Sequence, residues 1–281
     1  MLARNFEDYI IEAEHRVITL EDYASTPASA FLKYIVSAKD AANQCLNKFK
    51  TSARSRTYTR DALDSIYLIN AGLLASIMGN FETYQKYLFA GMFEYSIYLK
   101  KFDIDRFLKQ LKTTEKAEKS TKFEIDFVRI GAYRDSAVPV GLILAEHLSN
   151  WQSPTVVNNF FKAFGLENMS HHPVDIYSNE DKKKLSVLWQ MRHSIVHTAS
   201  TITLPDAQKV PSLNSYGGKV ISLDRQFINE VARKLHPIIK AATNNMKSVY
   251  IHNLKLDTPA DIRIRIGDLF KVSSTCSTWL R

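Results

Sequence analysis

Cysteine is scarce in this chain of 281 residues, where Cys45 and Cys276 stand far apart in the sequence. No CxxC pair is present, which argues against a cysteine-based zinc site. Two isolated cysteines fit a protein from a reducing compartment. A chain of this length buries enough apolar surface to fold without covalent staples.

Glycine and proline are also scarce, with nine and eight residues. Because these two residues interrupt regular structure most often, long stretches without them predict long helices. No internal repeat or low-complexity segment is visible, so repeat architectures are not indicated.

The chain lacks a recognisable secretory signal and a long uninterrupted apolar run. Its first residues, MLARNFEDYIIEAEHR, mix charged and apolar side chains, whereas a signal has a basic end and an apolar core. The most apolar region, 66–78, is interrupted by Asn70 and Ser76, and a membrane-spanning helix needs about 20 mostly apolar residues. We therefore expect a buried helix here and a cytoplasmic protein without membrane contact.

Positive charge is in excess, with 37 Lys and Arg against 29 Asp and Glu and a formal net charge of +8. Basic side chains displace counterions from phosphates, so this excess favours a polyanionic partner such as RNA. A solubilising surface charge explains it equally well.

Apolar residues at steps of three and four predict helices along most of the chain. The pattern at 61–100 is apolar on most sides, which is typical of the central helix of a bundle. Gly79 and Asn80 mark a candidate kink or break in it. The expected helices span 28–50, 61–100, 103–112, 121–134, 139–149, 154–163, 180–198 and 223–246.

Two regions show β-like patterns. Residues 199–223 contain two prolines and a Gly-Gly pair between the runs TITL and KVISL, which predicts a hairpin or a long loop. DIRIRIGD, at 261–268, alternates like a strand. The predicted fold is mainly α, a helix bundle with a small β-like insertion or hairpin after the helix at 180–198.

The stretch MRHSIVHTAS, residues 191–200, concentrates Arg192, His193 and His197 at the end of a predicted helix. His193 and His197 are four residues apart and share a helix face. Arg192 lies about 140° from His197 around an ideal helix, and its long side chain can reach towards the histidines. Positive charge at a helix C-terminus also interacts favourably with the helix dipole, which is one explanation of the cluster.

Two kinds of chemistry suit the same residues. A histidine pair at i and i+4 can bind zinc, but Ser194 stands where a zinc hydrolase places its glutamate, and a third ligand has to come from His171, His172 or a distant carboxylate. Alternatively, histidines transfer protons near neutral pH. An arginine can hold a phosphate. With RNA, whose 2′-hydroxyl is the nucleophile, arginine and two histidines suffice for cleavage without a metal.

The segment from Arg192 to His197, R-x4-H, resembles the signature of HEPN-domain ribonucleases. The run LINAGLLASIMGNFETYQKYL at 68–88, with Glu82 and Tyr84, is similar to a central helix of the phage-defence and toxin branches. The later LDRQFINEVARKL suits RiboL-PSP-like members. The resemblance covers about 28–246, which leaves 1–27 as an N-terminal extension and 247–281 as an appendage packed on the HEPN-like domain.

The resemblance implies a metal-independent endoribonuclease without cofactors that leaves a 2′,3′-cyclic phosphate. It implies a homodimer with a composite active site, acting on tRNA or other RNA in phage defence by abortive infection or as a toxin. Arg192 would bind the scissile phosphate, His197 would be the general base or acid, and His193 would orient the substrate or assist proton transfer. Glu82 would hold Arg192 or His197, unless it forms an ordinary buried ion pair.

Basic runs are candidates for the RNA path, although a solvated helix face explains each of them equally well. Two other functions stay open. One is a non-catalytic HEPN binding or scaffold module that partners a nucleotidyltransferase or an antitoxin, and the other is a zinc hydrolase. The candidate RNA-binding residues are Lys182, Lys183, Lys184, Arg54 and Arg56, with Arg60 beside them.

Overall fold

The computed structural model describes residues 18–47, 49, 56–118, 139–168, 170 and 172–272. This part of the chain is mainly helical, which confirms the predicted fold class. The predicted helix at 121–134 lies outside the described residues. The α-helices are α1 (Leu20–Ser25), α2 (Pro27–Leu46), α3 (Arg56–Glu94), α4 (Ile104–Glu118), α6 (Val140–His147), α7 (Pro154–Lys162), α8 (Asn179–His197), α9 (Leu204–Lys209), α10 (Phe227–His252) and α11 (Ala260–Leu269), with 3-10 turns η2 (Ser96–Tyr98) and η3 (Pro211–Tyr216).

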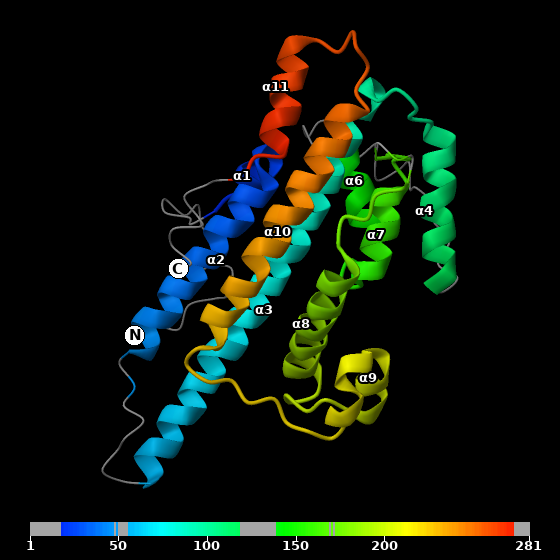
Figure 1. The fold of residues 1–281 in the computed structure, drawn as a ribbon. Coiled ribbons are helices and arrows are strands. Elements are labelled where there is room, and N and C mark those ends of the chain that lie inside the picture. Colours follow the sequence, from blue (N-terminus) through cyan, green and yellow to red (C-terminus); the bar gives the residue numbers. More distant parts are fainter. Residues whose placement is uncertain are drawn as a thin grey trace, which may run out of the picture.

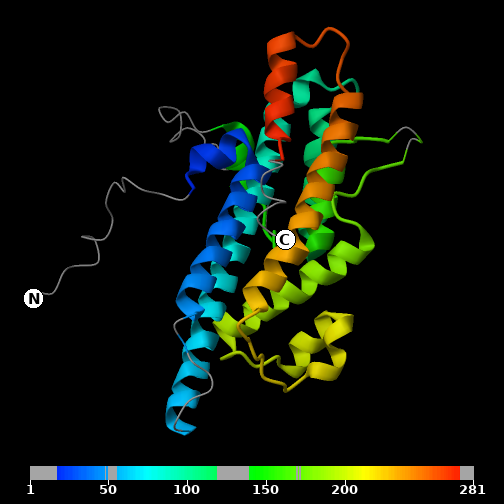
Figure 2. The same ribbon diagram turned by 60° about the vertical axis from the view of Figure 1, so that its left-hand side comes forward.

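The long helices α2, α3 and α10 run side by side, and α8 packs on another side of α3 (Figures 1 and 2). Aromatic rings join these layers, because Phe81 of α3 contacts Phe31 of α2 and Trp189 of α8. A second aromatic group surrounds Phe89, which is fully buried. Its ring contacts those of Phe107, Trp151, Phe160, Phe161 and Phe164.

Helix α3 is the central element and runs without a break through Gly79 and Asn80. The side chain of Asn80 fits this continuous helix, since its amide donates to the Ser76 carbonyl at 3.0 Å and its carbonyl accepts from the Tyr23 hydroxyl at 3.0 Å. Both polar groups of this residue are therefore satisfied without opening the helix.

The strand predicted at 261–268 is wrong, because this segment forms α11. Its alternating isoleucines do not share one face: Ile266 is buried, whereas Ile264 is 66% exposed. In a helix Ile262, Ile266 and Phe270 fall on one side, and they pack into the same core as Tyr23 of α1. Both ends of the described chain therefore join one core.

The β-like insertion is present as a bridge between Thr201 and Val220. The Ile202 amide donates to the Lys219 carbonyl at 2.9 Å, and the Ile221 amide donates to the Ser200 carbonyl at 2.8 Å. These bonds close the lobe that carries α9 and η3. A small apolar cluster attaches the lobe to α3, formed by Ala71, Ile202, Ala207, Val210, Leu213, Ile221 and Leu223.

Replacing Gly141 with alanine is expected to destabilise the protein by about 1–3 kcal/mol, the typical cost of overpacking. The added methyl would overlap the Ala90 carbonyl of α3, a backbone atom with little freedom to move aside. The matched control is Gly72→Ala within α3, where a Cβ meets no atom within 4 Å. That change should stabilise the helix by about 1 kcal/mol. Urea unfolding measures both, and equal midpoints for the two variants would contradict the close packing of α6 on α3.

Candidate active site at the end of α8

Helix α8 anchors its middle in the core and leaves its last turn at the surface. Leu185 and Trp189 are buried, whereas Val196 and His197 are exposed. After the helix ends, Ala199 and Ser200 adopt positive φ values of 46° and 66°. These residues turn the chain back, and the Ser200 amide donates to the Ser194 carbonyl at 2.8 Å. The turn leads directly to α9, which lies beside the end of α8 (Figure 1).

The two histidines share a face of α8, as their spacing predicts. Their ring centroids are 4.8 Å apart with an angle of 44° between the planes. The His193 side chain is 41% exposed and His197 is exposed. Two imidazoles from a single chain therefore lie next to each other where a large substrate can approach them.

Arg192 is partly buried and has no ion pair among the residues that the structure describes. Its Nε atom is buried and makes no hydrogen bond. A buried donor without a partner costs free energy, more so when the group is charged. Among the described residues, this nitrogen of the guanidinium is left without an acceptor.

Asp206 of α9 completes the cluster, and sequence reasoning missed it. Its Oδ2 lies 3.8 Å from the Nε2 of His193, and its side chain is only 8% exposed. The Lys209 ammonium donates to Oδ1 at 2.8 Å and the Thr203 hydroxyl donates to Oδ2 at 2.8 Å. The hydrogen bond from Lys209 lowers the pKa of the Asp206 carboxyl, and burial opposes that effect. The Thr203 hydroxyl and the charge of His193 lower this pKa further, so the carboxylate is ionised at neutral pH.

Glu82 lies elsewhere. Its carboxylate pairs with Lys86 at 3.0 Å, and Lys86 also reaches Glu146 of α6 at 3.2 Å. No contact of Glu82 with Arg192 or His197 is seen in the described part of the chain. The structure therefore shows the ordinary ion pair, which ties α3 to α6.

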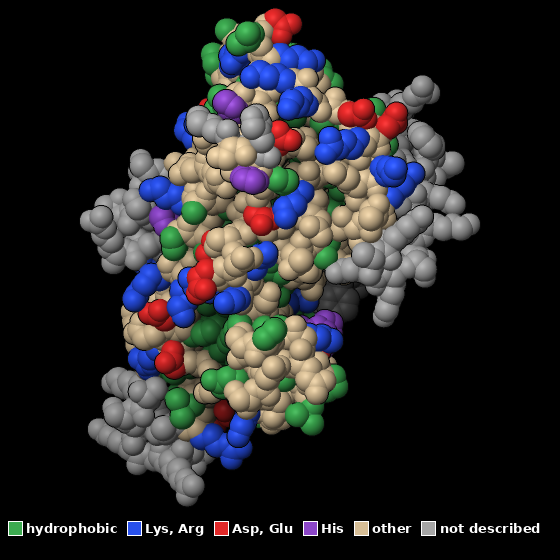
Figure 3. Space-filling model, turned by 45° about the vertical axis from the view of Figure 1, so that its right-hand side comes forward, with side chains coloured by type: hydrophobic (Ala, Val, Ile, Leu, Met, Phe, Trp, Pro, Cys, Tyr) green, Lys and Arg blue, Asp and Glu red, His purple; other side chains and the backbone are tan. Residues whose placement is uncertain are grey.

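The basic candidates for an RNA path are only partly described. Lys183 and Lys184 are exposed and Lys182 is partly exposed near the start of α8, about 12–15 Å along the helix from Arg192. Arg54 lies outside the described residues, and of Arg56 only the backbone, at the start of α3, is described. Figure 3 shows Lys and Arg side chains spread over one face with Asp and Glu between them.

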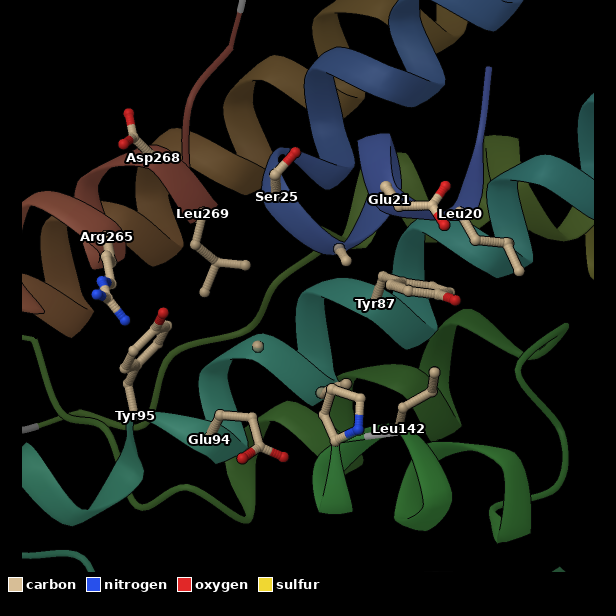
Figure 4. A pocket seen from close by; sticks show the side chains of 14 residues that line it. Leu20, Glu21, Ser25, Tyr87, Glu94, Tyr95, Leu142, Arg265, Asp268 and Leu269 are labelled. Carbon is tan, nitrogen blue, oxygen red and sulfur yellow. The ribbon is translucent and has the colours of Figure 1, made fainter. Parts of the chain in front are cut away.

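Two hollows are lined by residues other than the histidines. One, of about 610 Å³, runs between α8 and α10 and includes Met191 and Phe227. The other, of about 580 Å³, is formed by α1, α3, α6 and α11. In Figure 4 Arg265 and Tyr95 lie near one end of that second hollow, Leu20 and Tyr87 lie near the other, and Leu269 lies between them. Neither hollow is lined by Arg192, His193 or His197.

Within the described ranges, no group of three or more His, Cys, Asp or Glu side chains is placed to hold a metal ion, and His171, one of the suggested third ligands, lies outside them. One described helix, at Arg60–Glu94, is long and apolar enough to cross a membrane by length and composition alone. The core helix of a soluble bundle meets the same criterion. No family model, curated protein or solved structure matches the chain.

Proposed function

We propose that this protein is a metal-independent endoribonuclease of the HEPN type, which cuts RNA through attack by the 2′-hydroxyl and leaves a 2′,3′-cyclic phosphate. The observation that supports it is the pair of imidazoles at the end of α8, with ring centroids 4.8 Å apart, next in sequence to an arginine that has no ion pair among the described residues. In the proposed step the 2′-oxygen bonds to phosphorus as its proton passes to one imidazole. The bond from phosphorus to the 5′-oxygen breaks, and that oxygen takes a proton from the other imidazole.

Arg192 supplies the charge that this reaction needs. A guanidinium binds two phosphate oxygens at once and stabilises the negative charge that develops in the transition state. Its exposed neighbours allow a polynucleotide to reach it, since His197 and Val196 face solvent. The proposed substrate is cellular RNA such as tRNA, and the proposed setting is cytoplasmic phage defence or toxicity.

A second copy of the chain is part of the proposal. Exposed apolar side chains lie on the last turn of α8 and on the α9 lobe: Val196 is 48% exposed, Leu204 66% and Val220 69%. Contact through these side chains would bring two Arg192 and two histidine pairs towards one cleft. An antitoxin or another partner protein is the alternative occupant of this surface.

Replacing His197 with alanine is expected to lower RNA cleavage by about 10²- to 10⁴-fold, the usual effect of losing a general acid or base. Purified wild-type and variant proteins are incubated with total RNA and a chelator, and the ends of the fragments are identified. The wild type should leave 2′,3′-cyclic phosphates. The matched control is His252→Ala, which removes an exposed histidine at the end of α10 and should leave cleavage unchanged. Intact RNA with the wild type, or equal cleavage by His197→Ala, would contradict the proposal.

A further inference from the structure

Asp206 of α9 is the carboxylate that lies within ion-pair distance of the histidine pair, and it contacts only one of the two rings. Its Oδ2 is 3.8 Å from His193, and among the described residues no carboxylate lies within that distance of His197. The surroundings of the two imidazoles therefore differ, although the rings are neighbours.

The Asp206 side chain is held in place by its own helix end. Thr203 caps α9, and the Asp206 amide donates to the Thr203 hydroxyl oxygen at 3.3 Å. The same hydroxyl donates to the carboxylate, and Lys209 holds the other carboxylate oxygen. A negative charge in the first turn of a helix is also stabilised by the free backbone amides. The carboxylate is thus a fixed and ionised group.

The two rings are too close to carry two positive charges easily. Two positive charges at such a distance repel each other, so one proton on the pair is favoured over two. The attraction of Asp206 then decides which ring keeps the first proton. Around His193, the charged groups that the described contacts place are Asp206 and Lys209 from α9 and His197 from α8, and η3 (PSLNSY) carries no Asp, Glu, Lys, Arg or His.

We infer that Asp206 is a positioning residue that keeps the shared proton of the histidine pair on His193, which makes His193 the acid and His197 the base. This assignment of roles rests on the proposed RNA cleavage. His197 accepts the 2′-hydroxyl proton while His193 donates its proton to the departing 5′-oxygen, and the proton passes back between the rings before the next cycle. The preference of the proton for His193 over His197 does not depend on RNA.

The test follows each ring by nuclear magnetic resonance during a pH titration of the full-length protein, in wild type, Asp206→Asn and Lys209→Gln. Asp206→Asn keeps the shape of the side chain and its bond to Thr203, and should lower the pH at which His193 titrates by roughly 0.5–1. Lys209→Gln removes the competing cation and should shift that titration the opposite way.

RNA cleavage provides the second measurement. An acid must be protonated, so the rate falls as pH rises past the titration of His193. Asp206→Asn should move that alkaline limb to lower pH, and Lys209→Gln should move it to higher pH. If wild type leaves RNA intact while the titrations respond as expected, the nuclease proposal fails and the role of Asp206 stands. Unchanged His193 titration in both variants, or shifts in the same direction, would overturn the inference.

Discussion

Arg192→Ala should lower RNA cleavage by about 10²- to 10³-fold, the cost of removing one group that stabilises transition-state charge. The physical reason is that the Arg192 side chain is partly buried and has no ion pair among the described residues. Its Nε atom also has no hydrogen-bond acceptor there. We therefore expect this side chain to contribute little to folding and much to binding a phosphate. Single-turnover cleavage of a labelled RNA measures the loss.

The free energy of unfolding of Arg192→Ala tells whether Arg192 serves function or stability. Because removal of an unsatisfied buried donor relieves a desolvation penalty, Arg192→Ala should unfold at the same urea concentration as wild type or at a higher one. Arg233→Ala is the matched control, since Arg233 is exposed and paired with Glu230 at 3.1 Å; it should retain full cleavage. A marked loss of stability in Arg192→Ala with unchanged cleavage would contradict the assignment.

Phe89→Ala is expected to destabilise the protein by about 3–5 kcal/mol, the range for removing a buried aromatic side chain. Phe89 is fully buried in α3, and its ring joins α4 through Phe107 and α7 through Phe160. Its removal leaves a cavity where three helices meet, and large neighbouring rings cannot fill it without moving their helices. Thermal and urea unfolding measure the change.

Leu256→Ala is the control for that prediction, because Leu256 is 94% exposed. Its removal should change the free energy of unfolding by less than about 0.5 kcal/mol. If Phe89→Ala were equally mild, the aromatic group around Phe89 would not be the part of the core that holds α4 and α7 on α3.

The helices were the most predictable part of this protein. The central helix at 61–100 is α3 in the structure, and its apolar character on most sides reflects contacts with α2, α6, α8 and α10 around it. The error at 261–268 has a physical cause. Ile262 and Ile266 fit a helix period of four, and Ile262, Ile264 and Ile266 fit a strand period of two, so the pattern alone is ambiguous. The contact of α11 with α3 and α1 resolves it.

The sequence predicted only those residues of the candidate site that lie close together in the chain. Arg192, His193 and His197 belong to one helix, so their spacing determines which rings lie together. Asp206 is 13 residues beyond His193, and its approach depends on the turn at Ala199 and Ser200. The cap formed by Thr203 signals where α9 begins, but no feature of that segment points to a histidine.

The amino-acid sequence by itself determined the helical class and the juxtaposition of the two imidazoles, because hydrogen bonding within a helix sets distances over a few residues whatever the surroundings. Only the tertiary structure decided that Asp206 faces His193 and that Lys86, the partner of Glu82, also reaches Glu146 of α6. The contacts from Asp206 to His193 and from Lys86 to Glu146 join separate helices, and the way helices pack depends on the shape of the whole core.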